Sequence, residues 1–197
     1  MTAIPTCHRH GRPAERPQHE RASQAERRPP VLPARAYGGG MPREPLIVEF
    51  RQDAREAVID RMAEMASAQG GWLNLTPGLD MDFPPPDRSP LASLLGSRGP
   101  TVPLGTWTPP HGREPATAGI VHPEGPKAVR LLEERGAPVP AGWRVLQDHP
   151  KRGLVVAVVG GSERADFDRA LVWLVTATGA LCRWPRTGEW RALCYLP

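Results

Sequence analysis

The chain has 197 residues, of which 40% are hydrophobic, so it is long enough to fold as one domain around a real core. Its formal net charge of +4 comes from residues 1–40, which hold seven Arg and three Glu, whereas residues 41–197 hold 18 basic and 18 acidic side chains. A balanced domain has no excess positive charge with which to bind nucleic acid through counterion release, and this disfavours nucleic acid as a partner.

Cysteine usage and hydropathy restrict the cellular context. Three cysteines, Cys7, Cys182 and Cys194, form an odd set with no secretory signal, which disfavours a disulfide framework. The N-terminus is charged and lacks the apolar segment of a signal peptide. The longest uncharged apolar stretch, residues 170–182, is shorter than the roughly 18 residues that a bilayer requires. We therefore expect a cytoplasmic protein without a membrane segment.

Residues 1–40 are rich in Arg, Pro and Gln and carry few clustered aliphatic residues, which predicts a disordered basic tail. Translation could also start at Met41, in which case the tail would not belong to the protein. The tail contains a Cys7-His8-Arg9-His10 run, but zinc normally needs a second ligand pair, and none follows. The remaining residues, 41–197, are predicted to form a single α+β domain.

The first half of this domain predicts a β-α-β unit. A strand is expected over residues 46–50, followed by a helix over 53–68 with Asp53 as its N-cap. Further short strands are expected over 72–75 and 102–107. The Pro-rich loop between them holds three carboxylates, for which a solvated acidic loop is a better interpretation than a calcium site because the glycine and terminal glutamate of a calcium loop are missing: Asp80, Asp82 and Asp87.

The second half gives the clearest pattern, in the order β-α-β-β-α-β. The expected elements are strands over 117–121, 143–147, 154–159 and 189–196, a helix over 126–135, and a helix over 163–178 that Ser162 caps and Gly179 ends. This order resembles the ferredoxin-like fold over residues 116–197. The continuous apolar run 154–159 predicts a central strand, and the alternating runs 143–147 and 189–196 predict edge strands. Residues 46–107 would either widen this sheet or form a second small layer.

Three short runs, Gly119-Ile-Val-His122, Pro140-Ala-Gly-Trp143 and Asp148-His-Pro-Lys-Arg-Gly-Leu-Val-Val156, resemble a conserved family of proteins from high-GC actinobacteria. The family has no assigned activity. The resemblance implies a bacterial origin and a cytoplasmic location, and it supplies no catalytic residue.

Polar residues follow two of the predicted strands. His122 ends one strand, and Asp148 with His149 ends another; if a right-handed crossover joins these strands, both ends lie at the same edge of the sheet. His122 could then act as a general base, with Asp148 orienting a histidine. In the alternative interpretation, Asp148 caps a turn by binding its own backbone, and His122 simply ends a strand.

Basic residues are expected near the same edge and would favour an anionic ligand there: Lys127, Lys151 and Arg152. The chain has no phosphate-binding loop, dinucleotide fingerprint or serine elbow, so no cofactor and no metal are predicted.

Two functions follow from these features. The first is a non-catalytic cytosolic binding or protein-interaction domain, with homodimerisation through an edge strand as one form of it. The second is a small hydrolase or isomerase that acts on an anionic small molecule with His122, Asp148 and His149. RNA binding on the sheet is disfavoured, because residues 117–121 and 154–159 contain no aromatic side chain on which a base could stack.

Overall fold

A computed structural model describes residues 44–82, 102–124 and 127–197. The chain divides into two units, Met1–Ala34 and Arg35–Pro197, and every described residue belongs to the second. The predicted tail over 1–40, its Cys-His run, and Asp87 of the acidic loop lie outside the described residues.

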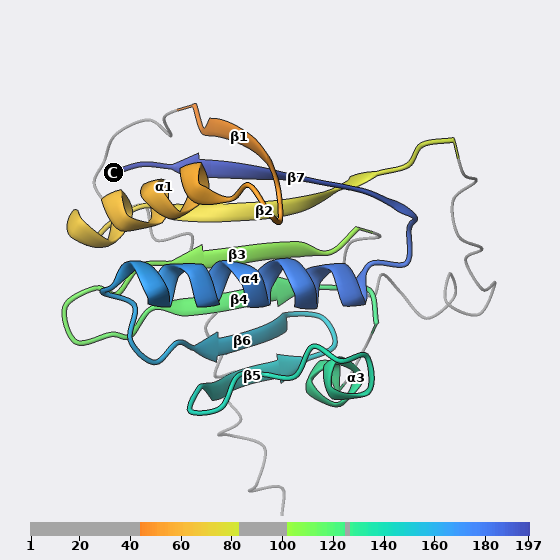
Figure 1. Ribbon diagram of the computed structural model, residues 1–197. Helices are drawn as coiled ribbons and strands as arrows, with labels where there is room; N and C mark the ends of the chain where they lie inside the picture. The colour runs from red at the N-terminus through yellow and green to blue at the C-terminus, as the bar shows by residue number, and fades with distance from the viewer. Residues whose placement is uncertain (1–43, 83–101, 125–126) are drawn as a thin grey trace, which may run out of the picture. The chain divides into compact units, whose positions relative to one another are not determined.

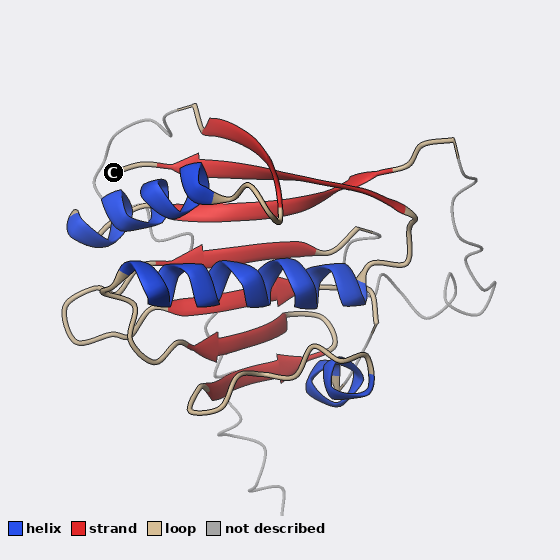
Figure 2. Cartoon of the chain, in the orientation of Figure 1, coloured by secondary structure: helices blue, strands red, loops and turns tan. Residues whose placement is uncertain are grey.

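The described residues form an α+β fold built on one seven-stranded sheet in which all neighbouring strands are antiparallel (Figure 2). The strand order is β1-β7-β2-β3-β4-β6-β5 (Figure 1). The strands are β1 (Leu46–Arg51), β2 (Trp72–Leu79), β3 (Leu104–Thr108), β4 (Thr117–Val121), β5 (Arg144–His149), β6 (Gly153–Ala157) and β7 (Arg186–Tyr195). The described helices are α1 (Glu56–Ser67), α3 (Ala128–Glu134) and α4 (Arg164–Leu181).

The three described helices cover one face of the sheet (Figure 1). Helix α4 lies over β2, β3 and β4, with α1 and α3 packed on either side of it. Strand residues alternate accordingly. In β2, Leu73 and Leu75 are buried beneath the helices, whereas Asn74 and Thr76 point to the other face, where no described helix lies. Strands β3 and β4 alternate in the same way, as expected of an antiparallel sheet with one covered face, whereas all five residues of β6 are buried.

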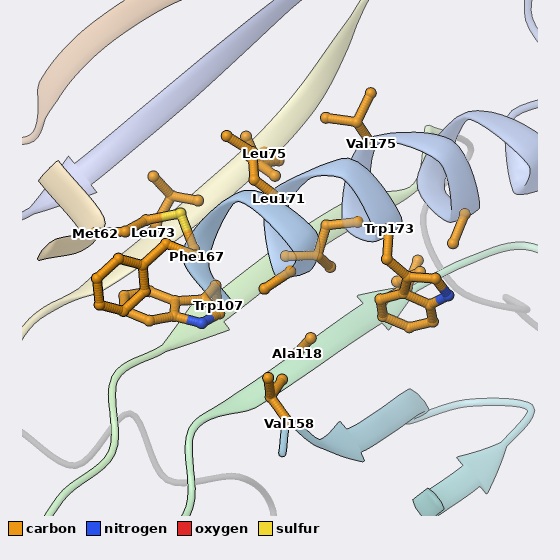
Figure 3. Packing of buried hydrophobic residues seen from close by; sticks show 14 of the residues in the cluster. Met62, Leu73, Leu75, Trp107, Ala118, Val158, Phe167, Leu171, Trp173 and Val175 are labelled. Carbon is orange, nitrogen blue, oxygen red and sulfur yellow. The ribbon is translucent and has the colours of Figure 1, made fainter. Parts of the chain in front are cut away.

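The core is centred on α4 (Figure 3). Its buried residues include the whole predicted apolar face, which is confirmed: Phe167, Ala170, Leu171, Leu174 and Val175. Two edge-to-face aromatic pairs connect the helix to its surroundings. Trp107 of β3 packs against Phe167 with ring centroids 5.9 Å apart, and Trp143 packs against Trp173 at 5.4 Å. Edge-to-face pairs have a preferred geometry, so they help to fix the position of the helix. They also stabilise the fold by more than the burial of their surface area alone.

The ferredoxin-like prediction holds only in part. Strand β6 lies between β4 and β5, as the apolar run predicted, and β5 is an edge strand. Strand β7, however, does not lie next to β4, because β2 and β3 are inserted between them. The prediction that β7 is an edge is therefore wrong: it pairs with β1 on one side and β2 on the other. Its alternating pattern reflects one helix-covered face and says nothing about lateral neighbours.

The open question about the first half is also answered. Strands β1 and β2 are parallel to each other with β7 between them, so the β1-α1-β2 unit widens the sheet and does not form a separate layer.

Two predicted helix boundaries need correction. Helix α4 begins after Glu163, not Ser162, and Asp166 accepts hydrogen bonds from the backbone N–H of Gly161 at 2.8 Å and of Glu163 at 3.4 Å. Gly179 does not end the helix but lies inside it. A Cβ atom there would lie 2.1 Å from Nη1 of Arg186, so this glycine leaves room for the Arg186 side chain against the last turns of the helix.

At α1, Asp53 is not the N-cap: the helix begins at Glu56, two residues later than predicted by that cap, and Arg55 occupies the capping position without a side-chain bond.

Candidate functional site

Strands β4 and β5 end at the same edge of the sheet. Both are antiparallel to β6, which lies between them, so they run parallel to each other, as the crossover argument predicted. Helix α3 connects them and lies at that edge (Figure 1). We call this region the β4–β5 edge. It comprises His122, Glu124 and Asp148, with Arg135 and Arg183, which pair with Glu124.

Asp148 lies on the helix-covered side, opposite the buried Leu154 of β6. Its two carboxylate oxygens accept hydrogen bonds from the backbone N–H groups of Ala128 at 3.1 Å and Val129 at 3.2 Å. Both N–H groups belong to the first turn of α3, where the helix itself offers no carbonyl to accept from them. The N-cap residue of α3, Lys127, provides no side-chain hydrogen bond either. Asp148 thus caps the helix from a neighbouring strand, a role that neither interpretation of its sequence position included.

His122 follows the buried Ile120 by two residues and is itself only 1% exposed. Neither ring nitrogen has a hydrogen-bond partner among the described residues. Burial lowers the pKa of His122, and the negative charges of Asp148 and Glu124 only partly oppose this effect. The imidazole is therefore neutral at pH 7, in a position that solvent does not reach.

A buried carboxylate, Glu124, lies at the centre of an ion-pair cluster at this edge. Its side chain is 7% exposed and accepts two bonds from Arg183, at 2.9 and 3.1 Å, and it lies 3.5 Å from Nη2 of Arg135. Arg135 also donates to the carbonyl oxygen of Ala180 at 2.7 Å. The hydrogen bonds from Arg183 lower the pKa of Glu124 although burial alone would raise it. The cluster ties the loop after β4 to the C-terminal ends of α3 and α4.

Sequence reasoning did not identify this cluster. Glu124 and Arg183 are 59 positions apart and occur in unremarkable polar segments. In a chain with 25 basic and 21 acidic residues, charge alone gives no signal for which of them pair.

The other predicted site residues are dispersed. His149 follows Asp148 directly and therefore points to the opposite face of the sheet, away from His122; its Nδ1 accepts the backbone N–H of Lys151 at 3.1 Å. Lys127 and Lys151 are exposed, and the backbone N–H of Arg152 donates to the carbonyl oxygen of His149 in the turn before β6. The structure thus brings His122 and Asp148 to one side of one edge and leaves His149 outside.

The described cysteines do not supply a nucleophile to this edge. Burial raises the pKa of Cys194 to about 11, so its thiol stays protonated at neutral pH. The thiol of Cys182 is half-buried and donates to the carbonyl oxygen of Trp184 at 3.7 Å. Among the described residues, no group of three or more His, Cys, Asp or Glu is placed to hold a metal ion.

The two outer strands of the sheet expose apolar side chains. On β1, Leu46 is 44% exposed and Ile47 is 55% exposed; on β5, Val145 and Leu146 are 41% and 48% exposed. Strand β1 pairs with β7 through all six of its residues without a shift, whereas the pairing of β5 with β6 shifts between Val145 and Gln147. A surface hollow of about 470 Å³ lies at the C-terminal end of β1, lined by Arg51, Gln52, Asp53, Arg55 and Gly188.

No family model, no curated protein and no solved structure matches the chain. None of the described helices combines the length and the apolarity that a bilayer-spanning segment needs.

Proposed function

We propose that this chain is a non-catalytic domain that binds a protein partner by strand addition at the outer edge of β1. The observation that carries the proposal is the form of this strand. It is the outermost strand on its side of the described sheet, its pairing with β7 is regular over all six residues, and it exposes Leu46 and Ile47. A regular edge strand presents unpaired backbone N–H and C=O groups, which an extended segment of another protein can bind.

The opposite edge is less suitable for strand addition. Between Val145 and Gln147 the register of β5 shifts against β6, which is the pattern of a β-bulge. A bulge bends the strand and interrupts its regular hydrogen-bonding positions, and natural proteins use this device to protect sheet edges. The exposed Leu146 lies at the bulge itself, so an added strand would not find a continuous ladder there.

The alternative proposal, a small hydrolase or isomerase, requires acid–base groups that a substrate can reach. Both carboxylate oxygens of Asp148 are occupied by the first turn of α3, His149 faces the other side of the sheet, and His122 is 1% exposed. A general base must come within hydrogen-bond distance of the proton that it removes. These positions favour the binding domain over the enzyme.

Selection of extended peptides tests the proposal. Random nonapeptides displayed on phage would be selected on the wild type and then measured on two matched variants, Ile47→Lys at the β1 edge and Val145→Lys at the β5 edge. Because an edge lysine opposes strand addition, we expect selected peptides to bind the wild type and Val145→Lys alike and to lose about tenfold or more in affinity with Ile47→Lys. The selection uses protein immobilised at a density low enough to keep it monomeric. Peptides that ignore Ile47→Lys, or a selection on this monomeric protein that enriches none, would contradict the proposal.

A thermal-shift screen tests the alternative directly. Small carboxylates and phosphates would be added to the wild type and to the double variant His122→Ala/Arg152→Ala. The binding-domain proposal predicts no concentration-dependent rise in melting temperature for either protein. Stabilisation of the wild type alone would support a ligand site at the β4–β5 edge and overturn the proposal.

A further inference from the structure

Charges on the helix-free face of β1 and β7 alternate in sign. Glu49 lies opposite Arg191, whose Nη2 donates to its carboxylate at 2.9 Å, and Arg51 lies opposite Glu189. The side chains of Glu49 and Arg51 are 70% and 63% exposed. The sheet therefore ends, at the β1 edge, in one acidic and one basic side chain that are two residues apart and point to the same face.

An antiparallel copy of the same strand is complementary to this pattern. We propose that β1 pairs with β1 of a second copy of this chain around a two-fold axis at Phe50, so that two sheets join edge to edge. The inference rests on the proposed function, because it names the partner of the β1 edge. In this register, each Glu49 lies opposite Arg51 of the other copy, and the row across the four strands reads Arg191, Glu49, Arg51, Glu189, with alternating charge.

The two-fold symmetry restricts the choice of register. In a symmetric antiparallel pair, the residue on the axis lies opposite itself, and its neighbours on either side lie opposite each other. An axis at Glu49 would place two carboxylates in direct opposition, which is destabilising. An axis at Val48 would set Glu49 opposite Ile47 and leave its charge unmatched across the seam. The axis at Phe50 forms two opposite-charge pairs and places two phenyl rings next to each other on the helix-covered side, each beside Trp190 of its own chain.

Shape supports the same register. The exposed apolar side chains of β1, Leu46 and Ile47, lie at its N-terminal end, and the hollow of about 470 Å³ lies at its C-terminal end. With Phe50 on the axis, the paired part of β1 runs from Glu49 to Arg51, because the strand ends at Arg51 and the chain turns at Gln52 and Asp53. The N-terminal end of each strand, with Leu46 and Ile47, then extends past Arg51 of the other copy toward the hollow that Arg51 lines, and symmetry forms this approach twice. The axis is perpendicular to the sheet, so both helical layers lie on the same face of the joined sheet.

A pair of charge-reversal variants tests this arrangement. The full-length wild type is expected to show a mass of twice 21.5 kDa in sedimentation equilibrium at about 100 µM. Glu49→Arg alone creates two like-charge pairs across the seam, and so does Arg51→Glu alone, so each should weaken dimerisation by about tenfold or more. An equimolar mixture of the two variants should recover the dimer, because the mixed pair has opposite charges at both positions.

Controls separate the seam from the fold. Each reversal also places like charges opposite each other within the chain, because Glu49 pairs with Arg191 and Arg51 lies opposite Glu189. Since these side chains are more than half exposed, both variants should lose only a little in melting temperature and by similar amounts, and recovery of the dimer in their mixture cannot come from the fold of either monomer. Arg144→Glu, an exposed charge reversal on β5, should leave the dimer unchanged.

Dimers that persist in both single variants, or a mixture that stays monomeric, would refute the register. A monomeric wild type whose Ile47 edge still binds selected peptides would refute the dimer and leave the proposed function standing. A monomeric wild type that also binds no peptide would refute both.

Discussion

Removing the Glu124 carboxylate should destabilise the protein more than its position in a surface loop suggests. In Glu124→Gln, the two charge-assisted hydrogen bonds from Arg183, at 2.9 and 3.1 Å, and the attraction to Arg135 are weakened. Breaking a fully buried ion pair costs about 3–5 kcal/mol, but Arg183 and Arg135 are 54% and 38% exposed and can regain water. We therefore expect a loss of about 2 kcal/mol, close to the value for hydrogen bonds with charged groups.

Urea unfolding followed by circular dichroism would measure this loss, which corresponds to a fall in melting temperature of about 4–8 °C for a chain of this size. The matched control is Glu134→Gln, because Glu134 pairs with Arg130 at 2.7 Å but both side chains are more than half exposed. That control should change the free energy of unfolding by less than about 0.5 kcal/mol. Equal effects of the two substitutions would refute the argument from burial.

The same carboxylate predicts a pH dependence with a definite sign. The pKa of Glu124 is lower in the folded chain than its ordinary value of 4.5, so the unfolded chain binds more protons in this range. The stabilisation from Glu124 is complete above pH 4.5 and is lost as the pH falls through the folded pKa. The difference in stability between the wild type and Glu124→Gln should therefore shrink as the pH is lowered below about 4.5, and a difference that grows on acidification would contradict the assignment.

Three further predictions concern the core and the turns. Leu171→Ala removes a fully buried side chain from α4 and should cost about 2–5 kcal/mol in urea unfolding; a cost within error would mean that this face of the helix is not buried. The lowered pKa of His122 predicts that wild-type stability declines as the pH falls below 6.5, since only the unfolded chain readily binds the proton. His122→Leu should reduce that decline without destabilising the protein at pH 7, and identical acid limbs would refute the role of the imidazole. Gly153→Ala should cost at least about 1–3 kcal/mol, because Gly153 has a φ of +80° and a Cβ atom there would lie 2.3 Å from the carbonyl oxygen of Ile120; unchanged thermal stability would contradict the close approach of these strands.

The sequence determined the content of the domain and much of its local burial. The apolar spacing in residues 163–178 predicted the buried face of α4, and the continuous apolar run before Gly160 predicted that β6 is flanked on both sides. The crossover rule predicted that β4 and β5 run parallel around β6. These inferences succeeded because side-chain periodicity is a local property: it reports which face of an element is covered.

Only the tertiary structure decided which elements and which charges are neighbours. The alternation in β7 is the same whether its neighbour is β4, as the ferredoxin-like order required, or β1 and β2, as found, because a strand's pattern does not identify its lateral partners. The hydrogen-bond partners of Asp148 could likewise not be predicted from the sequence. Its carboxylate accepts from backbone N–H groups in the first turn of α3, and these groups come within reach only when β5 and α3 pack together. Glu124 and Arg183 meet for the same reason, across 59 positions of chain. Pairing between distant segments depends on how the whole chain minimises exposed apolar surface and unpaired polar groups, and that balance is settled only when the elements pack.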